Sequence, residues 1–338
     1  MSSPIRTILA SMRTRGVRYL LMGGQACVLY GAAEFSRDTG IAVLADAENL
    51  RRLTGALDDL GASVIAVPPF AAEYLERGHA VPFACAAADG MRVDVMARMR
   101  NVPPFAECWG RRSTYALPDL GDVEVLGLED LVRCKKTRRD KDWPMVRRLV
   151  EANYAEATAP GDALGVTAER VAFWLRELRT PTLLREVSAR AAAGPPPYRA
   201  LLDDAAQSRP AAALAAEGAD DAAIAAALAD EERLERDADD AYWRPLIREL
   251  EELRLEELRH AARRRVWRGF PTVPAYRRRR SSGARRSRTS STACPGPLRS
   301  VTVARSRVAS MFSLRFTRLI SRQIRSAVAT ASAWLSAA

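Results

Sequence analysis

The sequence has few of the residues that build metal centres, disulfide frameworks or membrane spans. Its two histidines, His79 and His260, are too few for a histidine-based metal site. Its five cysteines are scattered without a CxxC pair or a metal-type spacing, so we expect reduced, mostly buried thiols in a cytoplasmic protein. No run of 18 uncharged apolar residues is present, so no transmembrane helix is predicted. Arginines interrupt residues 1–16 before an apolar stretch forms, and we expect no signal peptide.

Acidic residues are missing from the last part of the chain. Residues 263–338 contain 18 arginines and no Asp, Glu or Lys, whereas the whole chain has a formal net charge of +11. Because 11 − 18 is −7, residues 1–262 carry a net charge of −7. The part of the chain that is expected to fold is therefore mildly acidic, and the basicity is a property of the tail.

The tail allows two interpretations. Residues 269–300 are dominated by Arg, Ser, Pro and Gly, which predicts disorder. From residue 301 onward an apolar stripe lies opposite Arg315, Arg318, Arg322 and Arg325, and this pattern is typical of a basic amphipathic helix that contacts an anionic surface. A GC-rich gene that is read out of frame also yields Arg, Ser, Ala and Pro without acidic residues. A frameshift product therefore remains the alternative.

Residues 1–155 alternate short apolar runs with helical patterns. A helix is expected between Asp46, a typical N-cap residue, and Gly61, a typical stop signal. The leucines between them recur at helical spacing. The sequence PDLGD between residues 113–117 and 123–128 predicts a hairpin. Further strands are expected at residues 17–22, 38–45, 63–67, 80–86 and 91–97. This order predicts an α/β domain with a mixed sheet and flanking helices.

Residues 165–262 are helical by period and propensity, and they end in a long charged segment rich in Ala, Glu, Arg and Leu. We therefore expect three parts: an α/β domain over residues 1–155, a helical domain over residues 165–262, and an Arg-rich tail over residues 263–338. The long charged helix is interpreted as a solvated or bundle-packing helix.

Two carboxylates in the α/β part are candidates for chemistry. Side chains alternate along a strand, so residues 38 and 40 share one face, as do residues 92 and 94. If the two strands are neighbours, Asp38 and Asp94 converge and are able to hold a hard cation such as Mg²⁺. The pair Gly23 and Gly24 follows an apolar strand and opens a helix, where backbone N–H groups can approach phosphate oxygens. Together these parts suit phosphoryl or nucleotidyl transfer.

Each of these features also has a purely structural interpretation. A Gly-Gly pair after a strand is usually a tight turn, and a single Asp in an alternating strand usually faces solvent. Lys135 and Lys136, two of only three lysines in the chain, are candidates for contact with a triphosphate or a nucleic acid. They are equally compatible with a helix C-terminus, where cations are favourable, or with ion pairs to nearby aspartates.

Residues 19–45 and 91–97 resemble the polymerase-beta-like nucleotidyltransferase superfamily, in particular its small bacterial members from toxin–antitoxin and phage-defence systems. The resemblance covers about residues 1–155. It is carried by an apolar-Gly-Gly turn, an acidic position on the next strand, a third acidic position on a later strand, and a basic segment: Met22, Gly23, Gly24, Gly31, Arg37, Asp38, Asp94, Lys135, Lys136, Arg139, Asp140 and Asp142. It implies Asp38 and Asp94 as catalytic Mg²⁺ ligands. It also implies a nucleoside triphosphate (NTP) held by Gly23, Gly24, Lys135 and Lys136.

The departure from the family pattern is at residue 40, where a second Asp is expected and Gly40 stands. Asp46 has the same strand parity, but it is better explained as a helix N-cap. Two functions follow from the resemblance. An active protein transfers a nucleoside monophosphate from an NTP to a hydroxyl of an RNA, protein or small-molecule acceptor. A catalytically defective relative acts instead as a protein- or nucleic-acid-binding module. The sequence does not identify the acceptor, the nucleotide or the oligomeric state.

Overall fold

The computed structural model describes residues 3–118, 120–159 and 165–268, with side chains described up to residue 262. The chain divides into two units, residues 1–256 and residues 257–338. In the second unit the description covers only the helical residues 257–268. The predictions for residues 269–338 (a disordered linker, a basic amphipathic helix, or a frameshift product) therefore lie outside the described residues.

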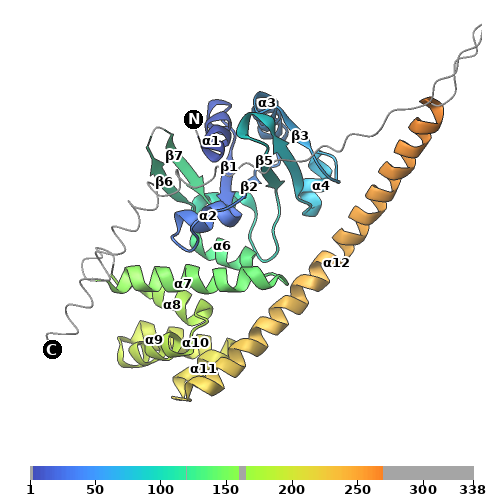
Figure 1. The fold of residues 1–338 in the computed structure, drawn as a ribbon. Helices are drawn as coiled ribbons and strands as arrows, with labels where there is room; N and C mark the ends of the chain where they lie inside the picture. Colours follow the sequence, from blue (N-terminus) through green and yellow to red (C-terminus); the bar gives the residue numbers. More distant parts are fainter. Residues whose placement is uncertain (1–2, 119, 160–164, 269–338) are drawn as a thin grey trace, which may run out of the picture. The chain divides into compact units, whose positions relative to one another are not determined.

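A seven-stranded mixed sheet forms the centre of the first unit (Figure 1). Its strands follow the order β3-β4-β5-β2-β1-β7-β6. β2 and β5 are parallel, as are β1 and β7, and the other neighbours are antiparallel. The strands are β1 (Tyr19–Met22), β2 (Asp38–Val43), β3 (Ala62–Val64), β4 (Val81–Cys85), β5 (Met91–Met96), β6 (Ser113–Leu117) and β7 (Gly121–Val125).

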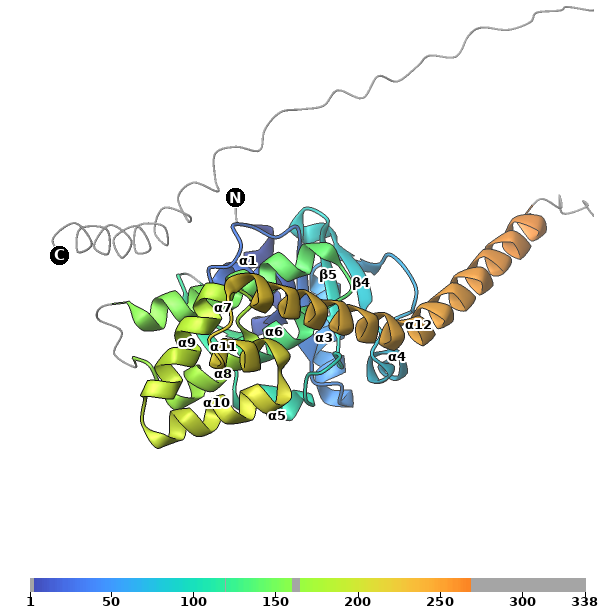
Figure 2. The same cartoon turned by 90° about the horizontal axis from the view of Figure 1, so that it is seen from below.

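Helices flank this sheet, and the chain then continues as a run of further helices, here called the helical region (Figures 1 and 2). The α/β architecture with a mixed sheet is as the sequence predicts. The helices around the sheet are α1 (Pro4–Thr14), α2 (Gly23–Leu29), α3 (Ala47–Asp59), α4 (Ala72–Arg77), α5 (Phe105–Gly110), α6 (Leu128–Lys135) and α7 (Trp143–Thr158), with short 3₁₀ turns η1 (Ala86–Ala88) and η2 (Asp140–Asp142). The helical region comprises α8 (Ala168–Glu177), α9 (Pro181–Ala193), α10 (Pro196–Ser208), α11 (Pro210–Ala216) and α12 (Asp221–Arg268).

Local sequence signals explain several of these elements. The Asp46 side chain accepts a hydrogen bond from the backbone N–H of Asn49, so it is the N-cap of α3 as predicted. The predicted hairpin is the antiparallel pair β6–β7. The strand predicted over residues 63–67 is shorter in the structure, where β3 ends at Val64 and the chain continues in bends.

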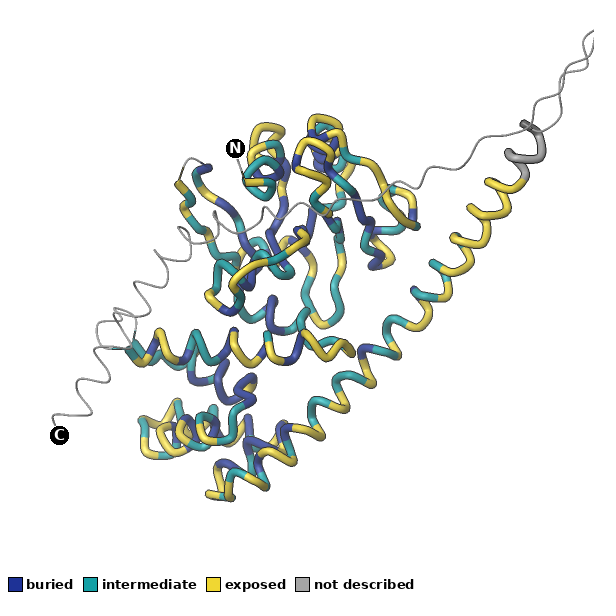
Figure 3. The backbone as a smooth tube through the Cα atoms, in the orientation of Figure 1, coloured by how far each residue is buried: buried dark blue, intermediate teal, exposed yellow. Residues whose placement is uncertain are grey.

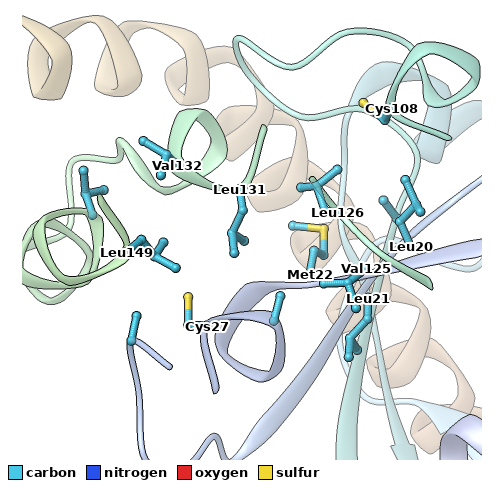
Figure 4. Close-up of a cluster of buried hydrophobic side chains, with 14 of the residues drawn as sticks. Leu20, Leu21, Met22, Cys27, Cys108, Val125, Leu126, Leu131, Val132 and Leu149 are labelled. Carbon is cyan, nitrogen blue, oxygen red and sulfur yellow. The ribbon is translucent and has the colours of Figure 1, made fainter. Parts of the chain in front are cut away.

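The hydrophobic core lies between the sheet and the helices that cover it. Close to the C-terminal end of β1, Met22 lies near Leu126, and Cys27 of α2 lies on the side of Leu131 and Leu149, which come from α6 and α7 (Figure 4). These residues are all less than a tenth exposed. Burial of apolar side chains at about 25 cal/mol per Å² is the main stabilising term for such a core. It fixes α2 and α6 against the same part of the sheet.

Residues 221–256 of α12, which belong to the first unit, run from the helical region along the α/β part, to which ion pairs attach them (Figures 1 and 2). Arg100 donates from Nη2 to Glu235 at 2.8 Å and from Nε to Asp239 at 3.1 Å. Asp239 also accepts from the backbone N–H of Arg138 at 2.8 Å. Further along α12, Glu249 contacts buried His79 at 2.7 Å. Residues 254–262 are exposed (Figure 3).

None of the helices in the described part of the chain has both the length and the apolar character that a membrane crossing requires.

Candidate functional site

The candidate site is at the N-terminal ends of the two parallel strands β2 and β5. One face of this strand pair is fully covered, because Thr39, Ile41, Val93 and Val95 are each 0% exposed. The opposite face opens toward the strand starts, where Asp38 and Arg92 are exposed and Asp94 is half-buried. Alternation along the strands places the two predicted carboxylates on this open face.

The strand register relates the two carboxylates diagonally. Asp38 is paired with Arg92, and Gly40 is paired with Asp94. From a strand spacing near 4.8 Å and a rise near 3.3 Å per residue, the Cα atoms of Asp38 and Asp94 are roughly 8 Å apart. Asp38 and Asp94 therefore lie near each other on one face, as the sequence predicts.

Opposing effects act on the pKa of Asp94. Burial raises its pKa, and the negative charge of Asp38 adds to that effect. Arg92 opposes the shift through a hydrogen bond from Nε to Oδ1 at 2.7 Å and through its charge, and the charge of Arg139 opposes it more weakly. The net result is a pKa above the ordinary aspartate value.

The Gly23–Gly24 turn lies against the strand that carries Asp38. Gly23 adopts a left-handed φ of 68°, and a Cβ atom there would lie 3.8 Å from the Cα of Gly40. A Cβ atom at Gly24 would overlap the Oγ of Ser36. Ser36 in turn donates to Asp38 Oδ1 at 3.0 Å. Glycine at residue 24 is thus required by Ser36, which holds the first carboxylate.

The position that the family pattern assigns to a second Asp is directly opposite Asp94. Gly40 is paired with Met22 on one side and with Asp94 on the other. A Cβ atom at residue 40 would lie 3.3 Å from Met22 Cγ, which is tighter than an ordinary contact. Met22 is 8% exposed and packs over this position. The side chain of Met22 therefore takes up part of the space that a carboxylate at residue 40 needs.

The two lysines predicted to bind nucleotide are both held in ion pairs. Lys135 Nζ is 3.2 Å from Asp142, and Lys136 Nζ is 2.6 Å from Glu177 of α8. Both carboxylate side chains are only 3% exposed. The structural interpretation of these lysines, as partners of buried acids, thus accounts for their positions. Any role in nucleotide binding remains a prediction and requires them to exchange partners.

Sequence reasoning missed Arg92 and Ser36 as members of the site. Arg92 stands two residues before Asp94, and strand parity alone places it on the same face. Ser36 also stands two residues before its partner, Asp38. The side chain of Ser36 packs against Gly24 and donates a hydrogen bond to Asp38. No spacing rule predicts this contact.

Asp38 and Asp94 are the oxygen donors that would hold a Mg²⁺ ion at this face. Magnesium prefers oxygen ligands and is commonly held by one or two carboxylates, with waters and substrate phosphates in its remaining positions. Among the described residues no group of three or more His, Cys, Asp or Glu is arranged to hold a metal ion. A second ion would need a further carboxylate that both ions share, and Gly40 supplies none at the position where the sequence resemblance expects it. A two-ion site is therefore not supported by the residues on this face.

No protein-family model matches the chain, and no curated protein matches it. Among solved structures, a "putative nucleotidyltransferase from H. pylori" is similar to this chain at a TM-score of 0.30 and 14% identity, over 70% of this chain and 94% of that chain. JHP933 from Helicobacter pylori is similar at a TM-score of 0.23 and 14% identity, over 72% of this chain and 93% of that chain. Likeness at these scores is too distant to assign a function, which therefore depends on the geometry of the site.

Proposed function

We propose that the α/β part is a nucleotidyltransferase-like module that binds an NTP at the open face of β2 and β5. The observation that carries this proposal is the placement of Asp38 and Asp94 on one face of adjacent parallel strands, beside the Gly23 turn. In this proposal Asp38 and Asp94 hold one Mg²⁺ ion, which neutralises phosphate charge when it is bound. The backbone at Gly23 and Gly24 is next to the phosphates.

In an active protein, the reaction is transfer of a nucleoside monophosphate to an acceptor hydroxyl, with pyrophosphate as the leaving group. Asp38 and Asp94 then serve as the catalytic carboxylates. The acceptor class is RNA, protein or a small molecule. Membership of the toxin–antitoxin or phage-defence type, and a cytoplasmic location, belong to the same proposal and rest on the sequence resemblance alone.

A second candidate, a nucleotide- or partner-binding module without transferase activity, is favoured by two specific observations. Gly40, paired with Asp94, stands where the sequence resemblance expects a second carboxylate, and Arg92 already pairs with Asp94. Loss of a metal contact that acts mainly in the transition state costs several kcal/mol, or orders of magnitude in rate. Binding of a nucleotide tolerates that loss better than transfer does.

Calorimetry with ATP and CTP, with and without Mg²⁺, tests the binding proposal. We expect Mg²⁺ to strengthen NTP binding to the native chain, and Asp38→Asn and Asp94→Asn to remove that gain. Asp122→Asn, at an exposed carboxylate on β7, is the matched control. Absence of NTP binding under every metal condition would contradict the proposal.

Restoring the second carboxylate separates a defective enzyme from a binding module that never transfers. Because a Cβ atom at residue 40 crowds Met22, Gly40→Asp is made both alone and together with Met22→Ala. Transfer of label from α-³²P-NTP is the measurement. New activity in the double variant identifies a crippled transferase. Activity already present in the native chain identifies an active one, and activity in neither supports the binding module.

A further inference from the structure

One aromatic side chain beside the candidate site is open to solvent. Phe35 is 67% exposed, the largest value among the large hydrophobic residues of the described chain. Every other aromatic residue whose side chain is described is buried or half-buried. Single exposed apolar residues are common on protein surfaces, so the position of Phe35 decides what its exposure signifies.

Phe35 lies in the loop that joins α2 to β2, and this loop leads directly to the first carboxylate. Phe35 stands three positions before Asp38, so their Cα atoms are at most about 11 Å apart, the reach of three extended residues. The intervening Ser36 donates a hydrogen bond to Asp38 Oδ1 at 3.0 Å and lies against Gly24. Phe35 is therefore next to the residues that the proposed function places around the phosphates.

Contacts fix the loop on both sides of Phe35. Before it, the backbone N–H of Ala32 donates to the carbonyl of Cys27 at 2.8 Å, and Ala32 is 4% exposed. After it, the carbonyl of Ser36 accepts from Gln25 Nε2 at 3.3 Å. The loop is thus attached to α2 at both ends. A flat side chain on an attached loop loses little conformational entropy when a ligand stacks on it.

We propose that Phe35 is a stacking platform for the base of the nucleotide. The inference rests on the proposed function, because it concerns the same NTP. The sugar separates the base from the phosphates, so a group that meets the base lies beside the two carboxylates and not between them, as Phe35 does. A phenyl ring has no hydrogen-bonding group and stacks on the π-face that every base has. The platform therefore selects a nucleotide over a bare polyphosphate without selecting one base.

Calorimetry on the full chain, with ATP and separately with inorganic triphosphate, both in Mg²⁺, tests the platform. We expect Phe35→Ala to weaken ATP binding about fivefold to a hundredfold, the range for loss of one base–aromatic stack. GTP, CTP and UTP should lose affinity as well. Triphosphate has no base, so its binding should be unchanged. The Arg-rich tail attracts anions equally in both proteins, so it does not affect the comparison.

Three further variants separate stacking from other effects. Ile65→Ala is the matched control, because Ile65 is 49% exposed and follows β3, which is three places from β2 in the strand order. Phe35→Leu keeps an apolar side chain without a π-face, and its ATP affinity should stay low. Phe35→Trp keeps a π-face and should bind ATP at least as tightly as the native chain. Thermal unfolding should be unchanged in all four variants, because both positions are exposed.

The fluorescence of a base analogue reports stacking directly. Stacking quenches the emission of 2-aminopurine, so 2-aminopurine riboside triphosphate is the probe, at concentrations that saturate each protein. We expect stronger quenching when it is bound to the native chain or to Phe35→Trp than when it is bound to Phe35→Leu. Equal quenching in all three proteins would overturn the platform.

Failure of this inference is distinguishable from failure of the proposed function. Equal ATP affinity in the native chain and Phe35→Ala would overturn the platform and leave NTP binding standing. An equal loss of ATP and triphosphate binding in Phe35→Ala would show a displaced loop, and full affinity in Phe35→Leu would show apolar contact without stacking. Either result, or an equal loss in Ile65→Ala, would also overturn it. If the native chain binds no NTP under any metal condition, both proposals fail.

Discussion

The contacts that attach α12 to the α/β part allow the loss of unfolding free energy to be predicted for a substitution at Asp239. Asp239 is buried on α12, and its side chain is 3% exposed. Its Oδ1 accepts from Arg100 Nε at 3.1 Å, and its Oδ2 accepts from the backbone N–H of Arg138 at 2.8 Å. Replacement by Ala leaves both donors short of a partner. Arg100 keeps Glu235 and the backbone carbonyl of Lys136, each at 2.8 Å.

Removing one partner of a buried ion pair costs about 3–5 kcal/mol of unfolding free energy, because the other charge is left uncompensated. Because Arg100 keeps two other partners, we expect Asp239→Ala to lower the unfolding free energy by about 3 kcal/mol, the lower end of this range. Asp239→Asn keeps one acceptor oxygen and loses the charge, so about half of that loss is expected. Asp237→Ala is the control on the same helix, because Asp237 is 71% exposed and lies 3.9 Å from its partner Arg233. A change within about 0.5 kcal/mol is expected there.

Urea denaturation of the full chain, followed by far-UV circular dichroism, measures these differences. Limited proteolysis is the second readout, because loss of the attachment exposes residues 231–256 to cleavage before the sheet unfolds. The reasoning is refuted if Asp239→Ala costs less than about 1 kcal/mol, or if Asp237→Ala costs as much as Asp239→Ala. It is also refuted if the loss occurs without earlier cleavage in α12.

Three further predictions follow from buried groups. Lys136→Met should lower the unfolding free energy by about 3 kcal/mol, because it leaves the buried carboxylate of Glu177 with only a 3.5 Å contact to Arg176. Lys141→Met, at an exposed residue of η2, should not lower it; equal effects in a thermal melt would contradict this. Burial alone would raise the pKa of Asp142, but its cationic and hydroxyl partners outweigh burial and lower it. Its stabilising contribution is therefore present above the ordinary aspartate pKa of about 4 and is lost as the pH falls through the depressed value, so Asp142→Asn should flatten the acid side of a stability–pH curve. Burial raises the pKa of the Cys27 thiol to about 11, so at pH 8 its thiolate fraction is on the order of 10⁻³. Labelling followed by mass spectrometry should show at least hundredfold slower alkylation of Cys27 in the native than in the urea-unfolded protein.

Much of the fold was predictable because its signals are local. The N-cap at Asp46 and the hairpin turn before Gly121 act within a few residues, and the structure contains both. The shared face of Asp38 and Asp94 followed from strand parity, once the two strands were taken as neighbours. Parity needs no knowledge of the core, and this is why the prediction succeeded.

The remaining features depend on contacts between distant segments. The partner of Lys136 is Glu177, which is 41 positions later in the sequence and belongs to another helix. The contact between Gly24 and Ser36 depends on how the loop before β2 folds back over α2. Spacing rules describe one element at a time, so they identify the charged residues without showing which pairs will be buried together.

In the proposed function, Gly40 stands where the sequence resemblance expects a second Asp, and two neighbouring residues bear on the result of restoring it. Met22 packs where a carboxylate at residue 40 would need space, and Arg92 supplies a positive charge beside Asp94. Because a Cβ atom at residue 40 would crowd Met22 and Arg92 already pairs with Asp94, Gly40→Asp alone should give less transfer activity than Gly40→Asp together with Met22→Ala. If Gly40→Asp alone restored full transfer, the packing of Met22 and the charge of Arg92 would be incidental.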